Sequence, residues 1–147
     1  MRPFQFRLET LLKFRRMQEE QAQVRLAEAT AAYVAERDRL DALETKLAEH
    51  VENYRRVQDE PVSITTLKLC RDYNDRLIGD ISHQRVRVST AEARRMDCIA
   101  ALEEAAKARK LVEKLRDKRL AQYQAEALLE EQKLLDELGL QAYSRQR

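Results

Sequence analysis

The stretch that decides the fold covers residues 47–74 and reads LAEHVENYRRVQDEPVSITTLKLCRDYN. On either side of Pro61, apolar residues recur at alternating spacings of four and three residues. This heptad repeat is typical of a helix that buries one narrow stripe against another helix. Pro61 disfavours helical geometry at Glu60, and Ser63 can cap a following helix through its hydroxyl. The stretch therefore predicts a turn at about residues 59–63 between two helices.

The heptad repeat extends outward from this turn in both directions. It predicts one helix over about residues 5–58 and a second over about residues 64–138. A short tail, residues 139–147, would begin at Gly139, a residue suited to the end of a helix. Because the connection is so short, the two helices should be antiparallel neighbours. The expected fold is all-α, a single coiled-coil hairpin domain over residues 1–147 whose C-terminal helix is the longer.

Folding the chain about residue 60 predicts which residues lie side by side in the seam, the apolar stripe shared by the two helices. Leu40 should then face Ile81, and Tyr33 should face Val88. Some seam positions are polar, and polar seam residues more often set the register of a coiled coil at a cost in stability. The acidic and basic residues of the seam are Arg15, Glu19, Glu36, Arg95 and Arg109.

Composition agrees with long helices and argues against several other classes of protein. Charged residues make up 37% of the chain, which has only two glycines and two prolines, so a loop-rich or sheet-rich globule is excluded. The formal net charge of +2 creates no global field that would draw the chain to nucleic acid or to a membrane. No apolar run approaches the roughly 18 residues of a membrane span. We expect a cytoplasmic protein without direct membrane insertion.

The sequence carries no motif for catalysis or metal binding. Phosphate-binding loops, dinucleotide fingerprints and the HExxH pair are all missing from it. His50 and His83 lack clustered ligand partners, while Cys70 and Cys98 share one seam stripe and lie too far apart on one helix for a disulfide. A leucine-zipper DNA binder is disfavoured by the apolar N-terminus and the turn. We expect no enzymatic activity, no cofactor and no nucleic-acid partner.

The C-terminal helix should extend beyond the end of its partner helix, because no residue of the first helix remains to pair with it after about Arg119. Each leucine exposed in this overhang would lose roughly 1.5–3 kcal/mol of burial, so the overhang is expected to have a binding partner. Residues 107–119 just before it are strongly basic, whereas the overhang is mainly acidic. The leucines of the overhang are Leu120, Leu128, Leu129, Leu134, Leu135, Leu138 and Leu140.

The residues at both ends of the chain are more distinctive than a heptad repeat alone requires. They read Phe4-Gln5-Phe6-Arg7-Leu8 and Leu11-Leu12-Lys13-Phe14-Arg15 at the start, and Glu130-Glu131-Gln132-Lys133-Leu134-Leu135-Asp136-Glu137 near the end. These segments resemble the two ends of the FliJ family of flagellar type III export proteins. The middle of the chain resembles that family only in its hairpin pattern and length.

The resemblance implies a non-enzymatic stalk. Members of this family insert their paired termini into the hexameric ring of the flagellar export ATPase, and they contact the export-gate membrane protein and export chaperones. The chain would then work in the cytoplasm, peripheral at the cytoplasmic face of the cell membrane, and would stimulate the ATPase. The alternatives are a stalk of a virulence-type III secretion system and a generic coiled-coil scaffold or tether.

The candidate contacts with the ATPase ring come from both ends of the chain. The turn end and the outer face near Tyr33 and Tyr54 would remain for the gate and the chaperones. By the resemblance, the candidates are Phe4, Phe6, Leu8, Leu12, Arg15, Gln132, Lys133, Asp136 and Glu137, and the basic segment adds Lys114, Arg116, Lys118 and Arg119.

Overall fold

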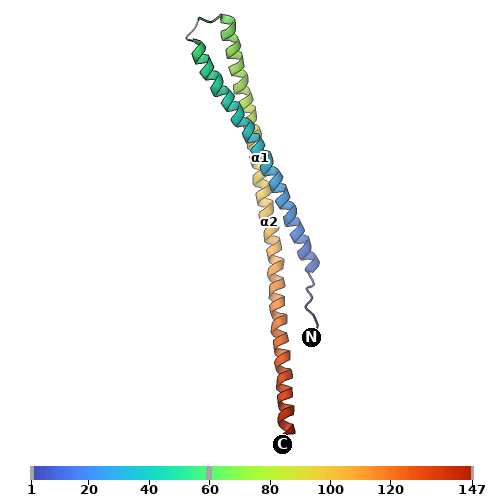
Figure 1. Ribbon diagram of the computed structural model, residues 1–147. Coiled ribbons are helices and arrows are strands. Elements are labelled where there is room, and N and C mark those ends of the chain that lie inside the picture. Colours follow the sequence, from blue (N-terminus) through green and yellow to red (C-terminus); the bar gives the residue numbers. More distant parts are fainter. Residues whose placement is uncertain (1, 59–60, 147) are drawn as a thin grey trace. The chain divides into compact units, whose positions relative to one another are not determined.

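The structure consists of two long helices (Figure 1). The computed structural model describes residues 2–58 and 61–146, where α1 spans Glu9–Gln58 and α2 spans Ile64–Arg145. No strand occurs in these described residues. The helices contact each other along their seams, and α2 is the longer. The predicted all-α helical hairpin is confirmed.

The start of α2 is capped as the sequence predicts. The Ser63 hydroxyl accepts a hydrogen bond from the backbone N–H of Thr66 (3.3 Å), and the Ser63 carbonyl accepts one from the N–H of Leu67 (3.2 Å). These bonds satisfy N–H groups that have no partner within the first turn of a helix. Asp59 and Glu60 of the predicted turn lie outside the described residues.

The first helix begins later than predicted, at Glu9 rather than near Gln5. The N–H of Glu9 bonds to the carbonyl of Phe6 (3.2 Å) in a turn just before the helix. Residues 2–6 are non-helical, and this places Phe4 against α2 while Phe6 is buried. Packing of these aromatic rings outweighs the modest gain of one further helical turn.

The second helix does not end at Leu138, so the predicted tail at 139–147 is wrong for its described residues: α2 continues through Gly139 to Arg145. No glycine in the described residues has a positive φ, so Gly139 does not act as a left-handed cap. A glycine inside a helix costs about 1 kcal/mol relative to alanine, and the residues beyond it, which include no proline, sustain the helix.

The chain falls into two compact units, which we describe separately. The turn unit contains residues 22–102, and the terminal unit contains residues 1–21 with 103–147. In each unit, a part of α1 lies beside an antiparallel part of α2 (Figure 1).

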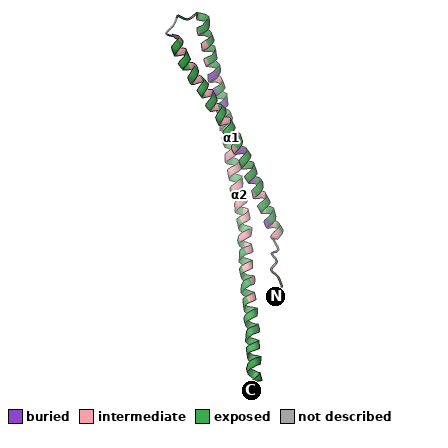
Figure 2. Ribbon diagram, in the orientation of Figure 1, coloured by how far each residue is buried: buried purple, intermediate pink, exposed green. Residues whose placement is uncertain are grey.

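Reduced solvent exposure follows the predicted seam. Every predicted seam position of α2 from Leu67 to Val112 is buried or half-buried, and so is every one of α1 from Leu12 to Val57 (Figure 2). The heptad pattern therefore identified the contact face of both helices. The most buried seam side chains are Leu12 in the terminal unit and Ala22, Ala29, Leu77, Ile81 and Gln84 in the turn unit.

The register of the turn unit agrees with the prediction near the turn. The Gln84 amide donates hydrogen bonds to the backbone carbonyl of Glu36 (2.8 Å) and to its carboxylate (2.5 Å). Farther from the turn, the recorded ring contact of Tyr33 is with the guanidinium of Arg95, 5.6 Å from the ring centroid. Arg95 lies one heptad beyond Val88, the residue predicted to face Tyr33. The long side chain of arginine can reach an aromatic ring at a distance that the short side chain of valine could not span.

Gly79 lies inside α2 with open space around it, since an added Cβ would meet nothing within 4 Å. We predict that Gly79→Ala raises the free energy of unfolding by about 1 kcal/mol, because alanine loses less backbone entropy in a helix. Urea denaturation followed by circular dichroism measures this change. Gly139→Ala is the control, because Gly139 lies in an exposed part of α2 and its substitution should leave the main transition in place. Destabilisation by Gly79→Ala would mean that α2 is interrupted at this position.

Candidate functional site

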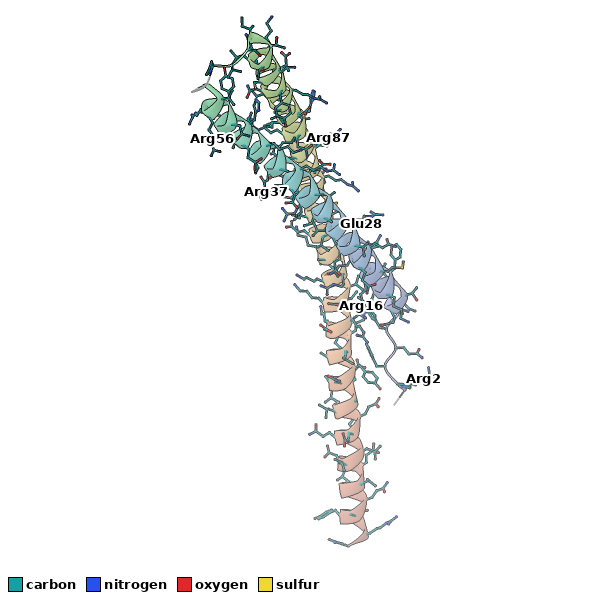
Figure 3. The ribbon with its side chains drawn as sticks, turned by 45° about the horizontal axis from the view of Figure 1, so that its top comes forward. Arg2, Arg16, Glu28, Arg37, Arg56 and Arg87 are labelled. Carbon is teal, nitrogen blue, oxygen red and sulfur yellow. The ribbon has the colours of Figure 1, made fainter. Side chains whose placement is uncertain are left out.

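The segment before α1 is held on the surface of α2 in the terminal unit. The rings of Phe4 and Tyr123 lie 5.5 Å apart between centroids, tilted by 53°. The Tyr123 hydroxyl donates a hydrogen bond to the carbonyl oxygen of Arg2 (2.5 Å). Phe6 is only 9% exposed. Residues 2–6 therefore form an N-terminal strap across α2, and Figure 3 shows Arg2 in this strap.

A cavity of about 600 Å³ lies between the strap and α2. From the strap it is lined by Arg2, Pro3, Phe4 and Gln5, and from α2 by Arg119, Gln122, Tyr123 and Glu126. The strap is thus attached through the Phe4 ring, the Arg2 carbonyl and the buried Phe6 ring, and it leaves this cavity between those contacts.

A network of charged side chains joins α1 and α2 deeper in the terminal unit. Arg109 pairs with Glu19 across the seam and with Glu113 on its own helix, where Nη1 and Oε2 are 2.6 Å apart. Arg16 reaches Glu113 from α1 at 3.4 Å. The hydrogen bond to Glu19, reinforced by the charge of Glu113, raises the pKa of Arg109 despite its partial desolvation. The Arg109 guanidinium therefore stays protonated in this network.

The basic segment predicted as a contact surface divides into paired and unpaired cations. Arg116 is half-buried, and its Nε lies 3.3 Å from a carboxylate oxygen of Glu9. Lys114, Lys118 and Arg119 are exposed, and they form no ion pair with any described residue. The positive charges of these three side chains, unlike that of Arg116, are not neutralised by a described carboxylate.

The predicted contact residues near the N-terminus include two that pack inside the hairpin. Leu12 is 0% exposed and Phe6 is nearly covered, so neither side chain reaches the surface of the folded chain. Phe4 is half-buried under the ring of Tyr123, whereas Leu8 is 37% exposed. Arg15 is half-buried and donates a hydrogen bond to Gln18 (3.1 Å). That these residues contact a partner stays a prediction.

The predicted residues near the C-terminus all lie on the surface of α2. From Leu128 to Gln146 every residue is exposed (Figure 2). Leucines account for much of this surface, and Leu134 and Leu138 are 60% and 53% exposed. Exposed in the same part of α2 are the predicted contact residues Gln132, Lys133, Asp136 and Glu137.

The exposed leucines continue a face of α2 that is covered earlier in the helix. Residues spaced by three, four or seven positions share one side of a helix, and Leu120, Tyr123, Ala127, Leu134 and Leu138 follow this spacing. The first three are half-buried and the last two are exposed. The apolar stripe of α2 thus extends past the end of the surface that α1 and the strap cover.

Tyr123 is an important residue that the sequence analysis missed. It is the residue of α2 that holds the strap, through both its ring and its hydroxyl. The available signal was its place three residues after Leu120 on the same helical face, at the level where the N-terminal aromatic residues had to find a contact.

The described residues bring together no group of three or more histidine, cysteine, aspartate or glutamate side chains that could hold a metal ion. Within the same part of the chain, neither helix contains a stretch long and apolar enough to cross a membrane.

Comparison with protein-family models found that the one described as flagellar FliJ protein matches residues 4–147. A comparison with curated proteins found no significant match.

Burial separates the two kinds of leucine in the terminal unit. We predict that Leu12→Ala lowers the free energy of unfolding by about 2–5 kcal/mol, because it leaves a cavity in the core. Leu134→Ala should change the free energy of unfolding by less than about 0.5 kcal/mol, since that side chain is exposed. Thermal or urea denaturation of the two variants tests the difference. Equal destabilisation would show that the leucines near the C-terminus are covered in solution.

Proposed function

Because the chain belongs to the FliJ family, and is thus a component of flagellar protein export, we propose that it is the stalk of the export ATPase. The terminal unit docks into the hexameric ATPase ring and stimulates ATP hydrolysis. The chain itself performs no chemistry, and its contribution is to bind the ring and bias its subunits towards cooperative hydrolysis.

The single observation that carries this proposal is the apolar stripe of α2 that continues beyond its covered part. Leu134 and Leu138 expose more than half of their surface to water. Each would gain roughly 1.5–3 kcal/mol if a partner buried it completely. Such a surface fits a helix that enters a cavity of another protein.

The charges beside the stripe favour a partner with an acidic or amide-lined rim. Lys114, Lys118 and Arg119 have no ion-pair partner among the described residues and lie just before the exposed leucines. Exposed charges of this kind act within a Debye length of about 8 Å at physiological ionic strength. They would therefore guide the terminal unit to the mouth of the ring, while the leucines supply apolar burial inside it.

The turn unit is left for the other partners that the family implies. In this proposal, the export-gate membrane protein and the export chaperones bind the turn end and the neighbouring outer face, near Tyr33 and Tyr54. Tyr33 is partly covered by Arg95, and Tyr54 is half-buried and lines a cleft near the turn.

Removing the exposed part of α2 tests the docking site. A chain that ends at Glu126 keeps Tyr123 and its strap contacts, so it should fold as a hairpin. It should no longer stimulate ATP hydrolysis by the purified cognate export ATPase, because the exposed leucines are gone. Circular dichroism verifies the fold of the truncated chain. Full stimulation by this chain would place the docking site elsewhere and refute the proposal.

Reversing the unpaired cations tests their part in docking. The triple variant Lys114→Glu, Lys118→Glu and Arg119→Glu should bind the ATPase about tenfold more weakly at low salt, since each exposed pair contributes up to about 1 kcal/mol. The difference should shrink as salt is added. Lys46→Glu is the control, because Lys46 is an exposed cation of the turn unit. Equal binding by the triple variant and the unaltered chain would exclude an electrostatic contribution.

A further inference from the structure

The turn unit contains a cleft that is separate from the proposed docking surface of the terminal unit. The last turns of α1 and the first turns of α2 lie apart near the turn (Figure 1), and a cleft of about 620 Å³ is found between them. Its apolar lining comes from Val51, Tyr54, Ile64 and Leu67. Ile64 is 73% exposed, so its side chain is not used to hold the helices together.

Among the residues that the structure describes, the charged side chains that line the cleft are all positive. They are Arg55, Lys68 and Arg71, and no described carboxylate lines the cleft with them. None of the three forms an ion pair or hydrogen bond with any residue that the structure describes. Some other arginines of the turn unit do pair with acids, as Arg85 does with Glu44 at 3.6 Å. Three unpaired cations around an apolar cleft indicate an anionic ligand.

The inner end of the cleft is closed by contacts between the two helices. The His50 Nε2–H donates a hydrogen bond to the carbonyl of Cys70 (2.9 Å), and the His50 ring meets Tyr73 edge to face at 4.8 Å. His50 and Cys70 also line the cleft. The cleft therefore has a defined inner end, whose position is set by the seam.

The lining favours one class of occupant. A second copy of the chain that met this one cleft to cleft would bring the same three cations against Arg55, Lys68 and Arg71, and like charges repel. A small inorganic anion would leave the apolar walls in water. A peptide that carries acidic side chains beside a large apolar side chain satisfies both parts of the lining.

We propose that this cleft binds a short segment of a partner protein in which carboxylates flank one or two large apolar side chains. The inference rests on the proposed function only in assigning the turn unit to partners other than the ATPase. The apolar side chain lies between the helices against Leu67 and Ile64. The flanking carboxylates pair with Arg55 and Arg71 at the rim.

Cys70 provides a direct probe of occupancy, because it lines the cleft and Cys98 does not. Both thiols are free and half-buried in the turn unit. The full-length chain is alkylated with iodoacetamide in the presence of a synthetic peptide in which Asp and Glu flank Leu and Phe. Mass spectrometry then follows each cysteine. We expect the peptide to slow alkylation of Cys70 and to leave that of Cys98 unchanged.

Two altered peptides separate the parts of the recognition. Replacing Asp and Glu by Asn and Gln should abolish protection of Cys70, and so should replacing Leu and Phe by Ser. Equal protection by the amide peptide would refute the role of charge. Equal protection by the serine peptide would reduce the cleft to a simple anion site, which also overturns the proposal. Equal slowing of Cys98 by the original peptide would show a global effect rather than binding in the cleft.

Variants of the chain provide the second measurement, the anisotropy of the fluorescently labelled acidic peptide. Arg55→Glu with Arg71→Glu should weaken its binding by about tenfold or more, because attraction becomes repulsion. Arg76→Glu is the control, because Arg76 is an exposed arginine that lies on α2, as Arg71 does, but outside the cleft. Unchanged binding by the double variant would overturn the proposal. The same double variant should still stimulate the ATPase. A failure of the peptide-binding proposal can therefore be distinguished from a failure of the proposed stalk function.

Discussion

The matching of polar residues across the seam is the constraint on which the helix pairing depends. In the terminal unit Glu19 meets Arg109, and in the turn unit Glu36 meets Gln84. A half-buried charge left opposite an apolar side chain is unfavourable, so each such pair penalises any other alignment of its helices. Leucines and alanines alone would tolerate a slide by one heptad, because the repeat presents similar residues again. The polar seam residues thus make one alignment of the two helices specific, although they reduce the apolar area of the seam.

Heptad spacing was sufficient to predict which face of each helix is covered, because burial in a two-helix pair depends on that period alone. Ser63 could be recognised as a cap because its hydroxyl acts on N–H groups only a few residues away. The helix ends at Glu9 and Arg145 could not be predicted in the same way. They depend on small differences between helix propensity, a glycine penalty and aromatic packing against a distant part of the chain.

The candidate site was predictable only in part, for the same reason. Spacing and composition were enough to indicate exposed leucines near Leu134 and cations near Lys118, since no residue of α1 remained to cover them. They did not distinguish Leu12, which is in the core, from Leu8, which is partly exposed, because both are apolar residues near one chain end. The role of Tyr123 depends on the strap, whose non-helical path has no periodic signal.

Within the described residues, the exposed part of α2 beyond Ala127 has no neighbouring helix to stabilise it. Its helical state therefore relies on the intrinsic preferences of its own residues, which for short helices in water are only marginal. A partner that binds this part must also supply the free energy of keeping it ordered. Residues that never touch such a partner would then tune its affinity by changing how often the helix is formed, and a helix-weakening residue such as Gly139 would lower that affinity.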